Sequence, residues 1–212
     1  MPSLATAFPD YIQRIGDRTP LYTAVADHTG ARRVLYPGSY LDIAPSYVWP
    51  SVTYLDSNAR ARKAFADPDR PGSLVRAHRR YPAEPDIEFI PGDYTRTLAE
   101  LPGAHWDLAL SLYAGPISEY VAHCLRPGGW LLANNSHADA GLAHLNPNFE
   151  LTAALHRNGS RYRLVTDDLD QYFQPTRTPH PTRTQLRTDG RGVRYTHPAD
   201  AYLFRRMSRP SD

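Results

Sequence analysis

The sequence predicts an α/β fold with a doubly wound, mostly parallel sheet and antiparallel strands at its C-terminal end. Between residues 32 and 135, short and nearly continuous apolar segments alternate with helical ones. This alternation is typical of parallel strands covered on both faces. After residue 148 the pattern changes to adjacent β-rich runs, which indicates added antiparallel strands.

The strands of the parallel part are expected where apolar, β-forming residues cluster: 32–36, 51–56, 87–93, 106–116 and 130–135. Helices are expected between them at 59–67 and 117–125, and a helix or a loop at 94–103. Pro45 and Pro50 limit the helix after the first strand to about one turn.

The C-terminal strands follow from a hairpin signal and a final apolar run. Asn158-Gly159 separates two β-like runs, a strong indication of a hairpin. Residues 199–207 complete the set as a last strand. The Pro-, Thr- and Arg-rich segment 174–198 is expected to be ordered, either as a connection or as a lid over an anionic substrate.

Length and composition fit one domain. The 212 residues, 41% of them hydrophobic, are enough for a single core, with a helical N-terminal segment at 1–31 and the α/β domain at 32–212. No apolar run is long enough to span a membrane, and the N-terminus lacks a signal-peptide pattern. Cys124 is the only cysteine, which excludes an intrachain disulfide. We expect a cytoplasmic protein.

The charge balance argues against a nucleic-acid partner. The net charge is +2, which is too small to indicate binding to a phosphate backbone. A small-molecule substrate is therefore preferred, and a homodimer stays open. The histidines and acids show no metal-ligand spacing, so no metal is expected.

Five short motifs follow one another at the expected strand ends: "YPGSY" (36–40), "YLDS" (54–57), "PGD" (91–93), "DLALS" (107–111) and "LRPGG" (125–129). In this order and spacing they resemble the class I S-adenosylmethionine-dependent methyltransferases, which have a Rossmann-like fold. The resemblance covers about residues 32–135. It implies an S-adenosylmethionine site at the carboxyl ends of the strands.

The resemblance also implies which residues would hold the cofactor. Gly38 matches the first glycine of the cofactor turn, Asp56 the acid that binds ribose hydroxyls, and Asp93 the acid that faces the adenine amino group. The expected cofactor residues are Tyr36, Pro37, Gly38, Ser39, Tyr40, Asp42, Asp56, Ser57, Asp93, Tyr94 and Ser111. Simpler structural alternatives exist, namely a strand-exit turn at Gly38 and helix N-caps at Asp56 and Asp93.

The sequence departs from the family pattern at the end of the site that would hold methionine. Tyr36 stands where the first strand usually ends in an acid, and Tyr40 and Asp42 replace glycines. In one interpretation Asp42 replaces the missing acid, and the tyrosines attract the sulfonium by cation–π interaction. In the other, the Tyr40 ring fills the pocket and no cofactor binds.

Candidate catalytic residues lie at the ends of the fourth and fifth strands. They are Tyr113, Asn134 and His137, of which His137 is the best general base because histidine titrates near neutral pH. A solvated loop histidine is the simpler interpretation. The leading hypothesis is an S-adenosylmethionine-dependent methyltransferase for a small molecule. Cyclisation or aminocarboxypropyl transfer with the same cofactor, or a catalytically inactive scaffold, are the alternatives.

Overall fold

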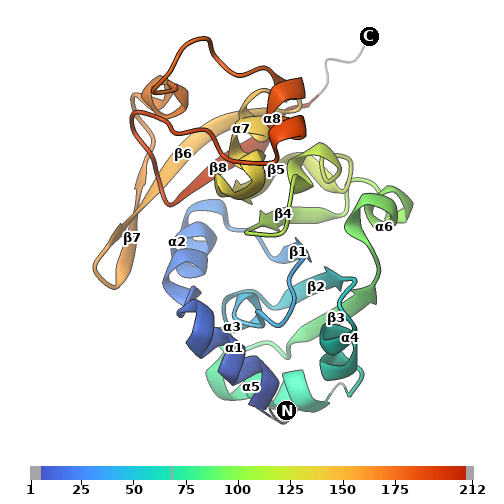
Figure 1. Ribbon diagram of the computed structural model, residues 1–212. Helices are drawn as coiled ribbons and strands as arrows, with labels where there is room; N and C mark the ends of the chain where they lie inside the picture. Colours follow the sequence, from blue (N-terminus) through green and yellow to red (C-terminus); the bar gives the residue numbers. More distant parts are fainter. Residues whose placement is uncertain (1–5, 68, 209–212) are drawn as a thin grey trace.

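The computed structural model describes residues 6–67 and 69–208 and contains one eight-stranded sheet in the order β3-β2-β1-β4-β5-β8-β6-β7. Figure 1 shows the sheet crossing the whole molecule, with β3 and β7 near opposite ends. The strands are β1 (Arg33–Pro37), β2 (Ser51–Asp56), β3 (Asp86–Pro91), β4 (Trp106–Ser111), β5 (Leu125–Ala133), β6 (Phe149–Asn158), β7 (Arg161–Val165) and β8 (Ala201–Arg206).

The strand pairing confirms the predicted fold class. The pairs among β1 to β5 are parallel, whereas β8 pairs antiparallel with β5 and β6, and β7 pairs antiparallel with β6. Because the first five strands are parallel, their carboxyl ends lie along one edge of the sheet. The residues that follow those ends are therefore brought together.

Helices from the first part of the chain cover one face of the sheet. They are α1 (Ala7–Ile15), α2 (Thr19–Thr29), α3 (Pro45–Val48), α4 (Ala59–Phe65) and α5 (Asp69–His78). Their apolar side chains form one core with alternate strand residues such as Val34 and Tyr36. The single turn of α3 between its two prolines confirms the expected short helix.

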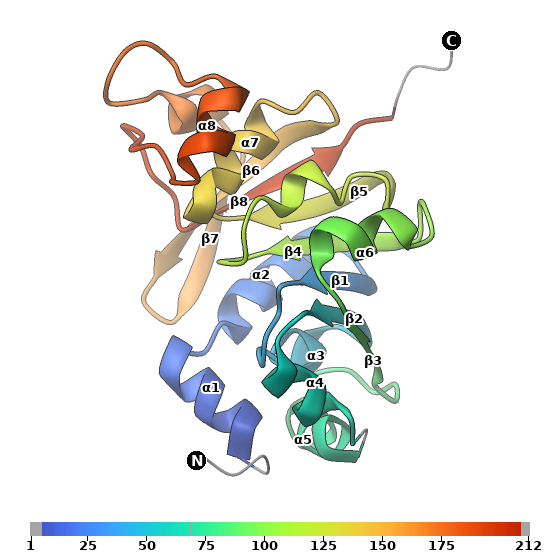
Figure 2. The ribbon, with the colours of Figure 1, turned by 45° about the vertical axis from the view of Figure 1, so that its right-hand side comes forward.

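The other face carries α6 (Tyr94–Glu100), α7 (Asp139–His144) and the 3₁₀ turn η2 (Ile117–Glu119). Leu35, which lies between Val34 and Tyr36, belongs to this second core. The alternation places successive side chains on opposite faces, as β geometry requires. Figure 2 shows α2 and α6 on different sides of the sheet.

The expected helix at 117–125 is wrong. Only the three-residue turn η2 forms, and β5 already begins at Leu125. The carbonyls of His123 and Cys124 accept hydrogen bonds from the backbone of Ala104, His105 and Trp106 at 2.8–3.1 Å. The end of the expected helix thus pairs with the chain that leads into β4, with Leu125 opposite Trp106, instead of continuing the turn of η2.

The fourth strand is shorter than expected. β4 ends at Ser111, because the chain turns through Tyr113 with φ +65° and Gly115 with φ +128°. Left-handed backbone of this kind cannot belong to a strand. The segment 112–116 is therefore a loop over the carboxyl edge of the sheet, and it becomes part of the candidate site.

The C-terminal part agrees with the hairpin and final strand expected from the sequence. β6 and β7 flank the turn at Gly159, and β8 inserts between β5 and β6. Within 174–198 the helix α8 (Arg183–Asp189) packs against α7, as Figure 2 shows. Arg183 binds the buried Glu119 carboxylate at 2.7 Å, and Arg187 binds the same group, which fixes α8 to η2.

Candidate functional site at the carboxyl edge of the sheet

The first part of the site is a cavity of about 200 Å³ between the ends of β2 and β3, here called the β2–β3 cavity. It is lined by Gly38, Leu55, Asp56, Ser57, Gly92, Asp93, Tyr94 and Ala114. Six of these residues come from the three motifs "YPGSY", "YLDS" and "PGD", and Tyr94 directly follows the last of them. Five of the expected cofactor residues (Gly38, Asp56, Ser57, Asp93 and Tyr94) thus share one cavity.

Asp56 is held by two backbone groups. Its Oδ2 accepts a hydrogen bond from the Tyr40 N–H at 2.7 Å, and its Oδ1 accepts one from the Asn58 N–H at 2.7 Å. Asn58, not Asp56, caps α4 by accepting the Arg60 N–H at 2.8 Å. A carboxylate has about four acceptor positions. Asp56 therefore keeps acceptor capacity toward the cavity.

Asp93 caps α6 and also lines the cavity. Its Oδ1 accepts hydrogen bonds from the Thr95 N–H at 2.8 Å and the Thr95 hydroxyl at 2.5 Å. These hydrogen bonds from Thr95 lower the pKa of Asp93, so the group stays ionised. Both bonds use the same oxygen, which leaves Oδ2 available to another donor. The N-cap interpretation is confirmed without excluding a second role.

The glycine turn after β1 is packed tightly against the loop after β4. Gly38 has φ +67°, and a Cβ placed on it would lie 2.1 Å from the Ala114 Cβ. The positive φ favours glycine here, and the contact leaves no room for a Cβ. Ala114 thus rests directly on the turn, at the place where backbone would approach a ligand.

Tyr40 does not fill the β2–β3 cavity. It has φ +48°, and its ring packs edge-on against Tyr11 of α1 at 4.9 Å between centroids. Its neighbour Ser39 is buried, and the Ser39 hydroxyl has no hydrogen-bond partner among residues 6–67 and 69–208. Buried hydroxyls without a partner are uncommon in folded proteins, and a ligand is one way of satisfying them.

Asp42 lies in a buried network of its own. Its Oδ2 accepts hydrogen bonds from the Tyr22 hydroxyl at 2.7 Å, the Tyr36 hydroxyl at 3.3 Å and Arg18 Nη1 at 3.1 Å. Its Oδ1 accepts the Ala44 N–H at 3.2 Å. Burial raises the pKa of Asp42, and the Arg18 cation opposes that rise. The acid that was expected at the methionine end of a cofactor site is thus bound by the chain's own donors.

A second cavity, the β4–hairpin cavity, lies between the start of α2, the end of β4 and the β6–β7 hairpin. It measures about 450 Å³ and is lined by Ile15, Gly16, Asp17, Arg18, Leu21, Leu112, Tyr113, Asn134, Arg157, Tyr162 and Asp200. It brings together Tyr113 and Asn134, two of the expected catalytic residues. The Arg18 guanidinium lies over the Tyr113 ring at 4.7 Å.

The third expected catalytic residue lies elsewhere. His137 is exposed in the 3₁₀ turn η3 (Ser136–Ala138) with φ +53°, and neither cavity includes it. Asn134 is buried, and its Oδ1 accepts the Ser136 N–H at 3.1 Å. The turn that positions Asn134 therefore directs His137 away from it.

Ser111 makes its hydrogen bond beneath the edge rather than into a cavity. Its hydroxyl donates to Oδ2 of the buried Asp139, while Ser118 donates to Oδ1 from its N–H at 3.0 Å and its hydroxyl at 2.5 Å. Burial raises the pKa of Asp139 to about 7, against the effect of these donors. The group connects the end of β4 with η2 and α7.

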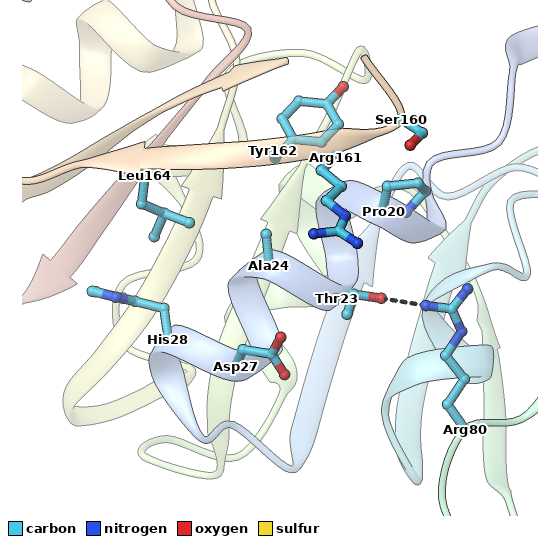
Figure 3. Close-up of a pocket in the computed structure, with 10 residues that line it drawn as sticks. All are labelled: Pro20, Thr23, Ala24, Asp27, His28, Arg80, Ser160, Arg161, Tyr162 and Leu164. Atoms are coloured by element: carbon cyan, nitrogen blue, oxygen red, sulfur yellow. Dashed lines mark hydrogen bonds between the residues drawn. The ribbon is translucent and has the colours of Figure 1, made fainter. Parts of the chain in front are cut away.

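A third cavity of about 690 Å³ lies between α2 and β7, away from the strand ends (Figure 3). Arg80 and Arg161 project into it from opposite walls, and Arg80 donates to the Thr23 hydroxyl at 2.9 Å. Tyr162 lines both this α2–β7 cavity and the β4–hairpin cavity, so the two are neighbours.

Two charged residues with partners at this edge of the sheet were missed by the sequence analysis. Arg18 precedes α2 and Asp139 begins α7, and neither lies in a motif. A local signal existed only for Asp139, as an acid within the short stretch after the fifth strand. Within residues 6–67 and 69–208, no cluster of three His, Cys, Asp or Glu side chains could hold a metal ion. Over those same ranges, every helix is too short or too polar to cross a membrane.

Comparison with known proteins shows the fold but no close relative. No protein-family model and no curated protein matches the sequence. An O-methyltransferase from Bacillus cereus, solved in complex with SAH, has a TM-score of 0.54 at 12% identity, over 98% of this chain and 92% of that one. The O-methyltransferase TomG from Streptomyces achromogenes, in complex with SAM, has a TM-score of 0.51 at 10% identity, over 99% and 91%.

A third structure, a cofactor-bound protein from MTB, has a TM-score of 0.51 at 17% identity, over 76% of this chain and 84% of that one. All three are similar over most of both chains despite the low identity. The chain, with its eight-stranded sheet and antiparallel C-terminal strands, thus shares the fold of these structures.

Proposed function

We propose that this protein binds S-adenosylmethionine at the carboxyl edge of β1 to β4 and transfers its methyl group to a small molecule. The observation that carries the proposal is the β2–β3 cavity, where Asp56 and Asp93 lie at adjacent strand ends beside Gly38. Two carboxylates with acceptor capacity on one cavity suit a ligand that carries several hydroxyl and amino donors.

The adenosine part of the cofactor fits these residues. Asp56 keeps acceptor positions for the ribose hydroxyls. Oδ2 of Asp93, which accepts no hydrogen bond from the described residues, suits the adenine amino group. Ser39 adds a buried hydroxyl without a partner in the described part of the chain. A cavity of about 200 Å³ is smaller than typical sites for whole cofactors, so this fit concerns the nucleoside alone.

The part of the β4–hairpin cavity around Asn134 is the proposed acceptor site. The volume of the whole cavity, about 450 Å³, lies within the range of small-molecule sites. The bound cofactor would supply an electrophilic methyl carbon. The contribution of the chain is to position the acceptor, with the Asn134 amide as a donor and the exposed Tyr113 ring as a wall. Positioning is a large part of the rate gain in such displacements.

A cofactor-free scaffold is the second candidate, because of one specific contact. Ala114 rests on Gly38 in the place where backbone would approach a ligand. If the loop 112–116 stays there, the β2–β3 cavity is closed toward the β4–hairpin cavity, and by itself it is smaller than a typical cofactor site. Under the first proposal this loop moves when the cofactor binds.

Calorimetric titration with S-adenosylmethionine and S-adenosylhomocysteine tests the proposal. We expect binding by the wild type, and Asp56→Asn should weaken it by about 10–100-fold, the usual effect of losing a charged hydrogen-bond partner. The matched control is Asp189→Asn at the exposed end of α8. Absence of binding at millimolar ligand would leave the scaffold as the better hypothesis.

If binding is observed, the products identify the chemistry. Incubation with candidate acceptors followed by mass spectrometry distinguishes S-adenosylhomocysteine, the product of methyl transfer, from methylthioadenosine. Methylthioadenosine would instead indicate cyclisation or aminocarboxypropyl transfer, because both reactions break the bond to the amino-acid chain.

A further inference from the structure

Arg18 holds an unusual position for a cation. Its Nη1 contacts the Asp42 carboxylate at 3.1 Å and the Tyr36 hydroxyl at 3.4 Å, and the guanidinium lies over the Tyr113 ring at 4.7 Å. The side chain is 17% exposed. Three segments, namely the end of β1, the loop 112–116 and the loop before α3, therefore fix a positive charge at the carboxyl edge of the sheet.

Asp42 cannot serve as the acid that would bind a ligand's ammonium group. It is 1% exposed, and its two oxygens already accept four hydrogen bonds from Arg18, Tyr22, Tyr36 and the Ala44 N–H. Four is about the number of acceptor positions that a carboxylate has. The charged group that reaches the cavity is thus the cation of the pair, not the anion.

Arg18 keeps donors for a ligand. Nη1 is the donor in its hydrogen bonds to Asp42 and Tyr36, and the guanidinium group has five N–H donors in all. The side chain lines the β4–hairpin cavity. A guanidinium that is held on one side and open on the other matches the planar, two-oxygen geometry of a carboxylate.

The two cavities lie on either side of one loop. Ala114 lines the β2–β3 cavity, and its neighbour Tyr113 lines the β4–hairpin cavity. An elongated ligand with its nucleoside beside Asp56 and Asp93 would pass the contact of Ala114 with Gly38 and extend toward Arg18. In the proposed cofactor, that far end is an amino acid with a carboxylate.

We infer that Arg18 binds the carboxylate of the cofactor's amino-acid end, so that a cation takes over recognition at the end where an acid was expected. The inference rests on the proposed function. It makes Arg18 a specificity residue that distinguishes nucleosides with an amino-acid tail from those without one. Asp42 then acts through Arg18, as the group that positions it.

Two ligands that differ in this tail provide the test. S-adenosylhomocysteine carries the amino-acid end, whereas methylthioadenosine has the same nucleoside and sulfur without it. Both are titrated calorimetrically into the wild type, Arg18→Met and Arg18→Met/Asp42→Asn. The double variant removes both charges, so that Asp42 is not left as an unpaired buried anion. Arg14→Met, on the exposed side of α1, is the control.

We expect Arg18→Met and the double variant to lose about 10–100-fold in affinity for S-adenosylhomocysteine, as for a lost charged hydrogen-bond partner. Their affinity for methylthioadenosine should equal that of the wild type and of Arg14→Met. That unchanged affinity also shows that the variants are folded. If both ligands weaken equally, or neither weakens, the assignment of Arg18 is wrong while the cofactor proposal stands. If the wild type binds neither ligand, both proposals fail.

Discussion

The two ends of the candidate site use the same residue type in different ways. At the ends of β2 and β3, Asp56 and Asp93 accept hydrogen bonds from residues two positions further along the chain, Asn58 and Thr95. Asp56 also accepts the N–H of Tyr40 in the turn after β1. Near the end of β1, Asp42 is enclosed by Arg18, Tyr22 and Tyr36 from separate elements. An acid that is held locally keeps free acceptor capacity, whereas an acid enclosed by side chains becomes part of the core.

The largest difference between the two ends should be seen in stability. Asp42→Asn should lower the free energy of unfolding by about 3–5 kcal/mol, because it breaks a buried ion pair and leaves Arg18 without its counter-charge. Asp56→Asn should cost about 1 kcal/mol, the usual value for one weakened hydrogen bond. Urea unfolding at pH 7, followed by tryptophan fluorescence, measures both. Equal losses would contradict the distinction between the two acids.

The contact between Gly38 and Ala114 can be tested by substituting Gly38. Gly38→Ala should cost about 1–2 kcal/mol for the left-handed backbone and about 1–3 kcal/mol more for the overlap with Ala114. Gly30→Ala is the matched control, because Gly30 has φ +62° and nothing within 4 Å of a new Cβ. Adding Ala114→Gly to Gly38→Ala should recover only the overlap cost. A double variant no more stable than Gly38→Ala alone would exclude the Ala114 contact as the cause.

Asp139, beneath the end of β4, should make stability depend on pH. Burial raises its pKa from 3.8 to about 7, so between these values the folded protein keeps a proton that the unfolded chain has lost. Stability should therefore fall as pH rises from 4 to 7, by about 1 kcal/mol per pH unit from this group, and level off above. Below pH 4 both states are protonated and the contribution is fully present.

Asp139→Asn should remove the contribution of this carboxyl group to the dependence of stability on pH. The raised pKa of Asp42 acts in the same direction and remains in the variant, so the difference between the two slopes is the quantity to measure. Urea midpoints at several pH values provide it. Parallel curves for wild type and Asp139→Asn would show that Asp139 is ionised throughout.

The smallest expected effect distinguishes the role of Asp93 as a helix N-cap from its proposed role in ligand binding. Asp93→Ala and Asn58→Ala each remove an N-cap and should each cost about 1 kcal/mol of stability. Only Asp93 lines the β2–β3 cavity. Only Asp93→Ala should therefore weaken the binding of methylthioadenosine, and equal binding by both variants would reduce Asp93 to a cap.

The sequence by itself determined the fold class and the end of the site beside β2 and β3. Strand patterns, the single-turn α3 and the hairpin at Gly159 follow from side-chain periodicity and from proline and glycine, which act locally. Asp56 and Asp93 could be placed because an acid after a parallel strand must reach the carboxyl edge. One hydrogen-bond partner of each, Asn58 and Thr95, is only two residues away, although Asp56 also accepts the N–H of Tyr40, 16 residues before it.

The part of the candidate site near the ends of β1 and β4 was decided only by the tertiary structure. Arg18 meets Asp42 across 24 residues of chain, and Ser111 meets Asp139 across 28. Such pairs depend on how α2 and α7 pack, which no local pattern contains. The missing helix at 117–125 has the same cause, because its apolar spacing was helical while its last residues pair with the chain leading into β4. Local propensity fixes a segment only where no distant partner competes for its hydrogen-bonding groups.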